Sequence, residues 1–130
     1  MLLSNYTSRV INLMNVACSL ALRSTEDNRH GCIVAKKGRI LGIGWNKDKT
    51  HPAAKHTFTQ CIHAEMAAIV SVNKEDLAGA DIYVARVKRC KGEPVGISRP
   101  CVHCMGLIRT SGIRRVYYTT NNGRVERIKL

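Results

Sequence analysis

Apolar residues near the start of the chain recur at the spacing of an α-helix. Between Ser4 and Ser24 they fall three or four positions apart, which places them on one side of a helix. Ser4 suits the start of such a helix, because its hydroxyl accepts a hydrogen bond from a free backbone N–H group. The pattern therefore predicts a core helix, whose buried side consists of Tyr6, Val10, Leu13, Met14, Ala17, Leu20 and Ala21.

The next part of the chain has the composition of β-strands. Residues 32–36 and 39–45 are rich in Ile, Val and Leu, and the turn Lys37-Gly38 joins them. We expect these two segments to form an antiparallel hairpin. Residues 81–88 alternate apolar and polar side chains, which predicts a third strand.

The end of the chain also alternates. Residues 114–120 and 124–130 flank Asn121-Asn122-Gly123, which is a strong hairpin turn because its residues tolerate positive φ. We therefore expect the last two strands to form an antiparallel hairpin.

Two more helices are predicted, over residues 63–73 and 101–111, and Gly112 ends the second. The elements then follow the order helix, hairpin, helix, strand, helix, hairpin. This order is typical of an α/β protein in which a five-stranded mixed sheet is flanked by helices. A chain of 130 residues has room for one such domain, which we expect to span residues 1–130.

The composition adds an excess of positive charge. The formal net charge is +12, and eleven of the 21 Lys and Arg residues lie from Arg86 onward. A basic surface attracts anions, which favours a nucleic acid or a phosphorylated small molecule as the partner. The alternative is a solvated surface that only keeps the protein in solution, because net charge does not locate a patch.

No stretch of the sequence resembles a membrane span or a secretion signal. Apolar runs stay shorter than the roughly 18 residues that a spanning helix needs, and the start lacks the pattern of a signal peptide. We therefore expect a cytoplasmic protein without a membrane partner, in which thiols stay reduced. Four of the six cysteines are then expected to be buried thiols, namely Cys18, Cys32, Cys61 and Cys90.

Two short motifs contain the residues with the clearest chemistry. His63 and Glu65 lie in mid-chain, and Cys101 and Cys104 form a Cys-x-x-Cys pair after Pro100. Zn²⁺ takes four tetrahedral ligands, and a catalytic site keeps one position open for water. The histidine and the two cysteines supply three ligands, and Glu65 is then the expected proton carrier. The motifs therefore predict a catalytic zinc site.

Two other interpretations of these residues remain open. A fourth protein ligand, such as His30 or Cys61, would close the metal site and make it structural. A Cys-x-x-Cys pair without a metal would be redox-active. Neither alternative explains the acidic residue Glu65 beside the histidine.

The two motifs resemble the signature of the cytidine and deoxycytidylate deaminase superfamily. The likeness extends to residues 31–35, 38–40 and 44–46, which resemble the family's first hairpin, and to the strand over residues 112–118. It covers roughly residues 5–130. The resemblance implies a three-layer cytidine-deaminase-like fold, Zn²⁺ as the cofactor and assembly into a homo-oligomer.

Several residues are expected to contact the substrate, the first of them by the resemblance and the others by their place beside the two motifs. Asn46 matches the family's asparagine that hydrogen-bonds the sugar hydroxyl, although an asparagine also commonly ends a strand in a turn. The backbone N–H groups of Ala64 and Cys101 are expected to stabilise developing charge, because both lie at helix starts. Ser98 and Arg99 complete the predicted contacts, Arg99 being either a phosphate ligand or a surface cation. His103 either points into the pocket or covers it.

Two features disagree about the branch of the family. Members of the deoxycytidylate type often have an asparagine where Ala68 stands, and the terminal hairpin resembles the free cytidine deaminases. Residues 112–118, in contrast, resemble the branch of deoxycytidylate, transfer-RNA and polynucleotide-editing enzymes. The sequence leaves the branch open.

The leading hypothesis is a hydrolytic deaminase that converts the cytosine of cytidine, deoxycytidine or dCMP to uracil and releases ammonia. The rival is an editor of cytosine or adenine in single-stranded DNA or RNA. Positive charge supports the rival, but one Trp, one Phe and four Tyr leave few platforms on which bases can stack. A zinc-stabilised binding module is a third hypothesis, in which Glu65 has no use.

Overall fold

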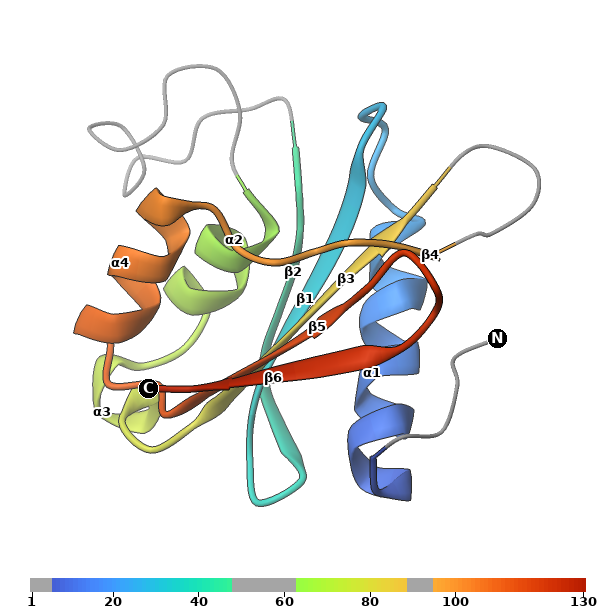
Figure 1. Cartoon of the computed structure of the whole chain (residues 1–130). Helices are drawn as coiled ribbons and strands as arrows, with labels where there is room; N and C mark the ends of the chain where they lie inside the picture. Colours follow the sequence, from blue (N-terminus) through green and yellow to red (C-terminus); the bar gives the residue numbers. More distant parts are fainter. Residues whose placement is uncertain (1–5, 48–62, 89–94) are drawn as a thin grey trace.

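The computed structural model describes residues 6–47, 63–88 and 95–130. Its helices are α1 (Ser8–Ala21), α2 (Ala64–Val70), α3 (Lys74–Leu77) and α4 (Val102–Thr110). Its strands are β1 (Arg29–Lys36), β2 (Arg39–Trp45), β3 (Asp81–Val87), β4 (Val95–Gly96), β5 (Arg115–Thr119) and β6 (Val125–Lys129). The strands form one mixed sheet, with α1 on one face and the other three helices on the opposite face (Figure 1).

Helix α1 forms the hydrophobic layer on one face of the sheet, as its apolar spacing predicts. Met14 and Ala17 are fully buried against the sheet residues Ile33 and Tyr83. The helix begins later than expected, because Thr7 is its N-cap and accepts a hydrogen bond from the Val10 N–H at 3.4 Å. The predicted cap Ser4 lies outside the described residues.

Helix α2 packs very closely on β2 because the contact consists of small residues. A Cβ atom added at Gly44 would lie 2.5 Å from the Ala68 nitrogen and 2.7 Å from the Ala64 carbonyl oxygen. Glycine is therefore required at this position for the two backbones to approach. The close approach also fixes His63, the N-cap of α2, over the sheet.

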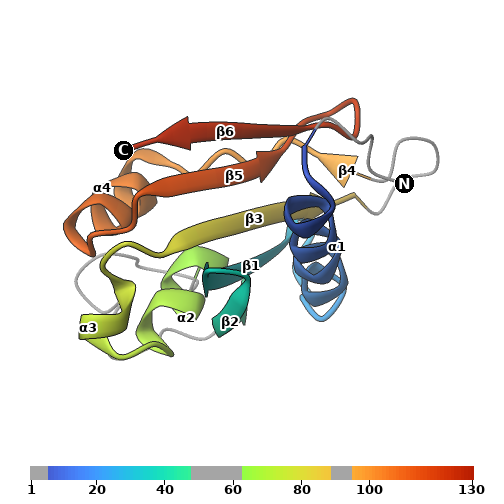
Figure 2. The ribbon, with the colours of Figure 1, turned by 90° about the horizontal axis from the view of Figure 1, so that it is seen from below.

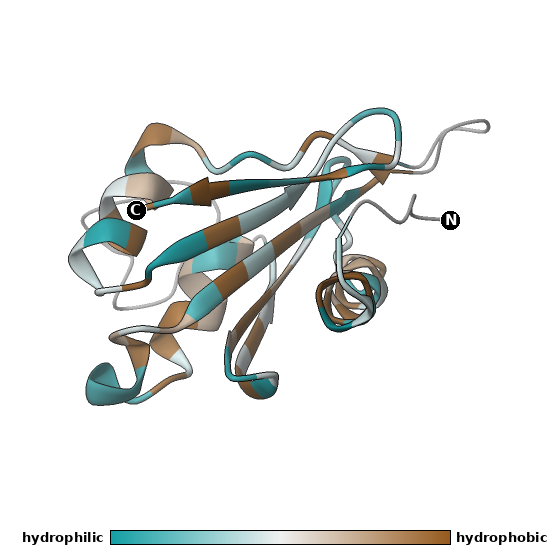
Figure 3. Cartoon of the chain, turned by 60° about the horizontal axis from the view of Figure 1, so that its bottom comes forward, coloured by the Kyte–Doolittle hydropathy of each residue, from teal (hydrophilic) through white to brown (hydrophobic). Residues whose placement is uncertain are grey.

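The sheet has the strand order β2-β1-β3-β5-β6, and β2 and β6 are its edges (Figure 2). Strand β3 is antiparallel to β1 and parallel to β5. Hydrophobic residues recur along the strands of the sheet (Figure 3), and in β3 the successive residues Ile82, Tyr83, Val84 and Ala85 are all buried, because helices cover both faces. The last pair, β5 and β6, is antiparallel and has Gly123 at φ 76° in its turn, so the predicted terminal hairpin is confirmed.

The sheet has six strands, so the predicted number of five was wrong. The additional strand is β4, which pairs with the end of β3 at Arg86 and Val87. A two-residue strand is too short to show alternation, so this segment appeared to be part of a loop. Helix α3 was missed for the same reason, because its single turn has only one buried apolar residue, Leu77.

Some predictions concern residues that the structure does not describe, among them Cys61 and Cys90. Cys18 and Cys32 are both buried free thiols, as expected. Within residues 6–47, 63–88 and 95–130, no helix has the length and apolar character needed to cross a membrane.

Candidate metal centre and its cavity

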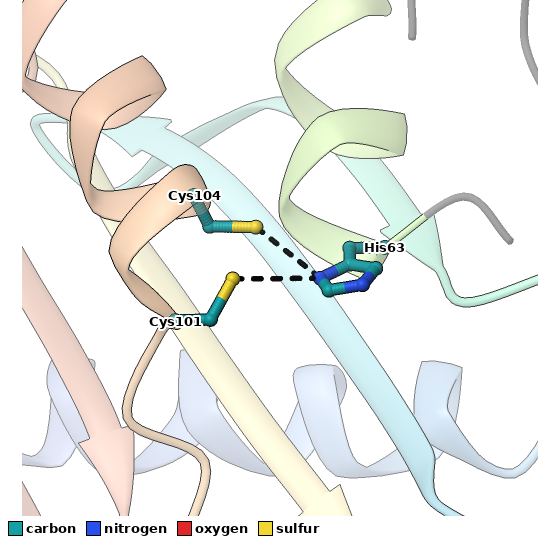
Figure 4. Close-up of side chains that lie close together, drawn as sticks. All are labelled: His63, Cys101 and Cys104. Atoms are coloured by element: carbon teal, nitrogen blue, oxygen red, sulfur yellow. Dashed lines mark hydrogen bonds between the residues drawn. The ribbon is translucent and has the colours of Figure 1, made fainter. Parts of the chain in front are cut away.

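His63, Cys101 and Cys104 lie together at the N-terminal ends of two neighbouring helices (Figure 4). His63 is the N-cap of α2, Cys101 is the N-cap of α4, and Cys104 lies in the first turn of α4. The His63 Nδ1 atom lies 3.4 Å from the Cys104 sulfur and 3.9 Å from the Cys101 sulfur. All three donor atoms lie within 4.8 Å of one another.

The geometry of this cluster fits a zinc ion. Zinc bonds of about 2.3 Å to sulfur and about 2.0 Å to nitrogen place tetrahedral donors about 3.5 Å apart. The two measured nitrogen-to-sulfur distances, 3.4 Å and 3.9 Å, lie on either side of this value. Among the described residues the cluster contains three donors and His30 is not one of them, whereas Cys61, the other fourth ligand considered, lies outside the described residues.

The protonation behaviour of the cluster also fits a cation. Burial lowers the pKa of His63, which favours the neutral imidazole that metals bind, and the charge of His103 lowers it further. Burial and the neighbouring Glu65 carboxylate raise the pKa of the Cys104 thiol. A divalent cation reverses this effect, because a coordinated thiol loses its proton.

Glu65 lies in the first turn of α2, directly beside the three-donor cluster. Its side chain is only 5% exposed, and burial raises the pKa of its carboxyl group. Hydrogen bonds from its own backbone N–H and from the Cys104 thiol act in the opposite direction, but burial prevails. A carboxyl group with a raised pKa is suited to accept a proton and to return it near neutral pH.

A cavity of about 560 Å³ opens over the cluster. It contains three of the predicted substrate contacts, namely Asn46, Ala64 and Arg99. The remaining lining residues are Glu26, Asp27, Asn28, His30, His63, Glu65 and Cys101. The cavity therefore combines two members of the three-donor cluster, His63 and Cys101, with a buried carboxyl group and the exposed cation of Arg99.

Ser98, one of the predicted substrate contacts, does not line the cavity. Its side chain is 2% exposed, and its hydroxyl donates to the Val84 carbonyl oxygen and accepts from the Thr119 N–H, both at 2.7 Å. The backbone before α4 is irregular, so Ser98 points into the sheet while Arg99 points to the cavity. His103 is exposed on α4 and does not line the cavity.

The sequence did not identify one wall of the cavity. Glu26, Asp27 and Asn28 line it from the loop between α1 and β1, where the sequence shows only a polar segment. Burial lowers the pKa of the neighbouring His30, and the hydrogen bond with the Asn28 carbonyl oxygen acts in the opposite direction without cancelling the effect of burial. Polar loops are common on protein surfaces, so the sequence contains no signal that separates this wall from a solvated turn.

Two solved structures share this fold. The apo dCMP deaminase of the cyanophage S-TIM5 is 22% identical, with a TM-score of 0.63 over 88% of this chain and 85% of that one. The cytidine deaminase of Burkholderia pseudomallei is 18% identical, with a TM-score of 0.68 over 95% and 93%. The chain therefore has the cytidine-deaminase-like fold.

Sequence comparison assigns the chain more narrowly. Residues 7–120 match the family model described as the cytidine and deoxycytidylate deaminase zinc-binding region. The deoxycytidylate deaminase of Mycobacterium phage D29 is 31% identical over 126 residues, which cover 81% of this chain and 89% of that protein. The human protein of the same name is 29% identical over 123 residues, and the match spans only 62% of its length.

The chain belongs to the cytidine and deoxycytidylate deaminase family and is a hydrolytic deaminase. The resemblance noted in the sequence is thereby confirmed.

Proposed function

We propose that the protein is a zinc-dependent deoxycytidylate deaminase that converts dCMP and water to dUMP and ammonia. The observation that supports this most directly is the three-donor cluster, which opens onto a cavity containing Glu65 and Arg99. The related proteins named above as deoxycytidylate deaminases support a nucleotide as the substrate. A relative of the same fold was solved in complex with dCMP and dUMP.

His63, Cys101 and Cys104 would hold the zinc ion. When bound, the ion supplies a Lewis acid that lowers the pKa of water and so makes a nucleophile available near neutral pH. Glu65 would accept a proton from the attacking water and pass it to ring N3, which makes C4 electrophilic. A C–O bond would then form at C4. Glu65 would take the remaining proton of this new C4 hydroxyl and transfer it to the departing amine, so that the C–N bond breaks, a carbonyl forms at C4 and ammonia leaves.

Further residues of the cavity would orient the nucleotide. The backbone N–H of Ala64 lies at the start of α2, where the helix dipole favours negative charge. The guanidinium of Arg99 would bind the 5′-phosphate, because a planar guanidinium matches the geometry of phosphate oxygens. Asn46 would contact the sugar from the end of β2.

The described aromatic residues offer little support for the nucleic-acid-editing alternative. Tyr83, Tyr117 and Tyr118 are buried in the core and are not free to stack on bases. Trp45 lies beneath two cations, since Arg23 and Lys47 lie 5.1 Å and 4.7 Å from its ring centroid. The single-domain organisation, the cytoplasmic location and the homo-oligomer remain predictions.

The test is turnover by the zinc-loaded protein. Deoxycytidine, dCMP, dCTP and a single-stranded oligonucleotide are compared side by side, with uracil formation and ammonia release as readouts. We expect turnover of dCMP and a loss of about a thousandfold in Glu65→Gln, which has the same shape but cannot carry the proton. Glu75→Gln, on the exposed surface of α3, is the matched control.

Turnover of the oligonucleotide alone would establish the editing function instead. If deoxycytidine were turned over as efficiently as dCMP, the proposed binding of the 5′-phosphate by Arg99 would be refuted.

A further inference from the structure

Arg86, near the end of β3, contacts the wall of the cavity without lining it. Its Nη2 atom donates a hydrogen bond to the Asn28 Oδ1 atom at 2.9 Å. Asn28 lines the cavity and lies just before β1, whose first residues pair with the end of β3 (Figure 1). The contact therefore joins the sheet to the loop that was not identified from the sequence.

Asn28 in turn holds the side chain of Asn46. The Asn28 carbonyl oxygen accepts a hydrogen bond from Asn46 Nδ2 at 2.6 Å, and Asn46 Oδ1 accepts one from the His30 N–H at 2.9 Å. These bonds fix both ends of the Asn46 carboxamide. The Asn46 side chain is therefore oriented by the same loop that Arg86 holds.

The position of Arg86 is itself strongly constrained. Gly96 packs against the Arg86 side chain. A Cβ atom added at Gly96 would lie 3.1 Å from the Arg86 Cδ atom. The Arg86 Nε atom is buried and has no hydrogen-bond partner among the described residues. An unpaired buried donor is unfavourable, and an apolar side chain of similar length would avoid it. What arginine provides here, and an apolar residue would not, is the hydrogen bond to Asn28.

We propose that Arg86 is a positioning residue for the substrate site. It fixes Asn28, and through Asn28 it fixes the Asn46 carboxamide and the adjacent cavity wall. The identity of the substrate in this inference rests on the proposed function, whereas the restraint on the wall does not.

The kinetic test uses Arg86→Ala, Asn28→Ala and the double variant. Arg29→Ala is the matched control, because Arg29 also holds the ends of β1 and β3, by hydrogen bonds to the Val87 and Lys88 carbonyl oxygens at 3.3 and 2.9 Å. We expect Arg86→Ala to raise KM for dCMP about tenfold and to change kcat by less than about twofold. The reason is that a misplaced Asn46 would weaken binding of the substrate and of the transition state to the same extent.

Arg29→Ala should lower stability to a similar extent without this change in KM. Because Arg86 and Asn28 act through one contact, the double variant should raise KM no more than the larger single change. Equal KM values in Arg86→Ala and Arg29→Ala, or additive effects in the double variant, would overturn the proposal.

A second measurement needs no substrate. Amide hydrogen exchange, followed by mass spectrometry in peptides covering residues 26–31, reports opening of the wall. Exchange should be faster in Arg86→Ala and in Asn28→Ala than in the wild type and in Arg29→Ala. If dCMP is not turned over but exchange follows this pattern, the proposed function fails and the positioning role stands. Unchanged exchange in both variants would refute the positioning role.

Discussion

The contact between Gly44 and α2 allows a stringent test of how the fold places the metal ligands. A Cβ atom at position 44 would meet the Ala68 nitrogen at 2.5 Å, whereas ordinary contacts begin at 3.4 Å. The obstacle is backbone, which no side-chain rotation can move away. Gly44→Ala therefore requires α2 to move from the sheet by about 0.9 Å.

The consequence for the metal centre follows from the position of His63. As the N-cap of α2 it moves with the helix, while Cys101 and Cys104 stay on α4. Metal–ligand distances tolerate changes of only about 0.2 Å. We expect overpacking to lower the free energy of unfolding by about 1–3 kcal/mol. The affinity for zinc should fall about 10- to 100-fold, as it does when groups that orient ligands are changed.

Gly106→Ala in α4 is the matched control, because a Cβ atom there meets nothing within 4 Å. Alanine favours a helix over glycine by about 1 kcal/mol, so this variant should be at least as stable as the wild type. Urea unfolding and competition with a chromogenic zinc chelator measure the two effects. If Gly44→Ala retained wild-type stability and zinc affinity, the link between this packing and the metal site would be refuted.

Three further predictions follow from single contacts. Arg99→Ala should raise KM for dCMP about tenfold but leave deoxycytidine kinetics unchanged, and Arg109→Ala on the exposed side of α4 should change neither value. Ser98→Ala should lower the free energy of unfolding by about 1–3 kcal/mol in urea, since it leaves buried groups unpaired, and KM should not rise if its role is only structural. Burial raises the pKa of Cys18 to about 11, so after zinc chelation iodoacetamide at pH 8 should label the exposed Cys101 well before Cys18, as peptide mass mapping would show.

The main elements of the fold and the ligand cluster could be predicted because their signals are local in sequence. The core side of α1 follows from apolar residues three or four positions apart, and the final hairpin from Asn-Asn-Gly between alternating segments. The Cys-x-x-Cys spacing places one thiol at the N-cap and the other in the first turn of the same helix. What the sequence does not contain is the parallel pairing of β3 with β5, which brings α4 beside α2.

The remaining features depend on contacts between distant residues. Arg86 and Asn28 are 58 positions apart, and neither belongs to a motif. Ser98 and Arg99 are adjacent polar residues, yet the Ser98 hydroxyl is buried in the sheet and the Arg99 side chain faces the cavity. In an irregular segment no periodicity determines which way a side chain points.

Asn46 shows how a motif residue depends on such contacts. A carboxamide has two N–H donors and an oxygen with two lone pairs. The hydrogen bonds to Asn28 and from His30 use one donor and one lone pair, so one of each remains for a ligand. Asn46 can therefore end β2 through its hydrogen bonds to the protein and still have groups left to contact a substrate. Because the two protein contacts determine where the remaining groups point, we expect the residues that hold Asn28 to affect whether Asn46 can bind a substrate.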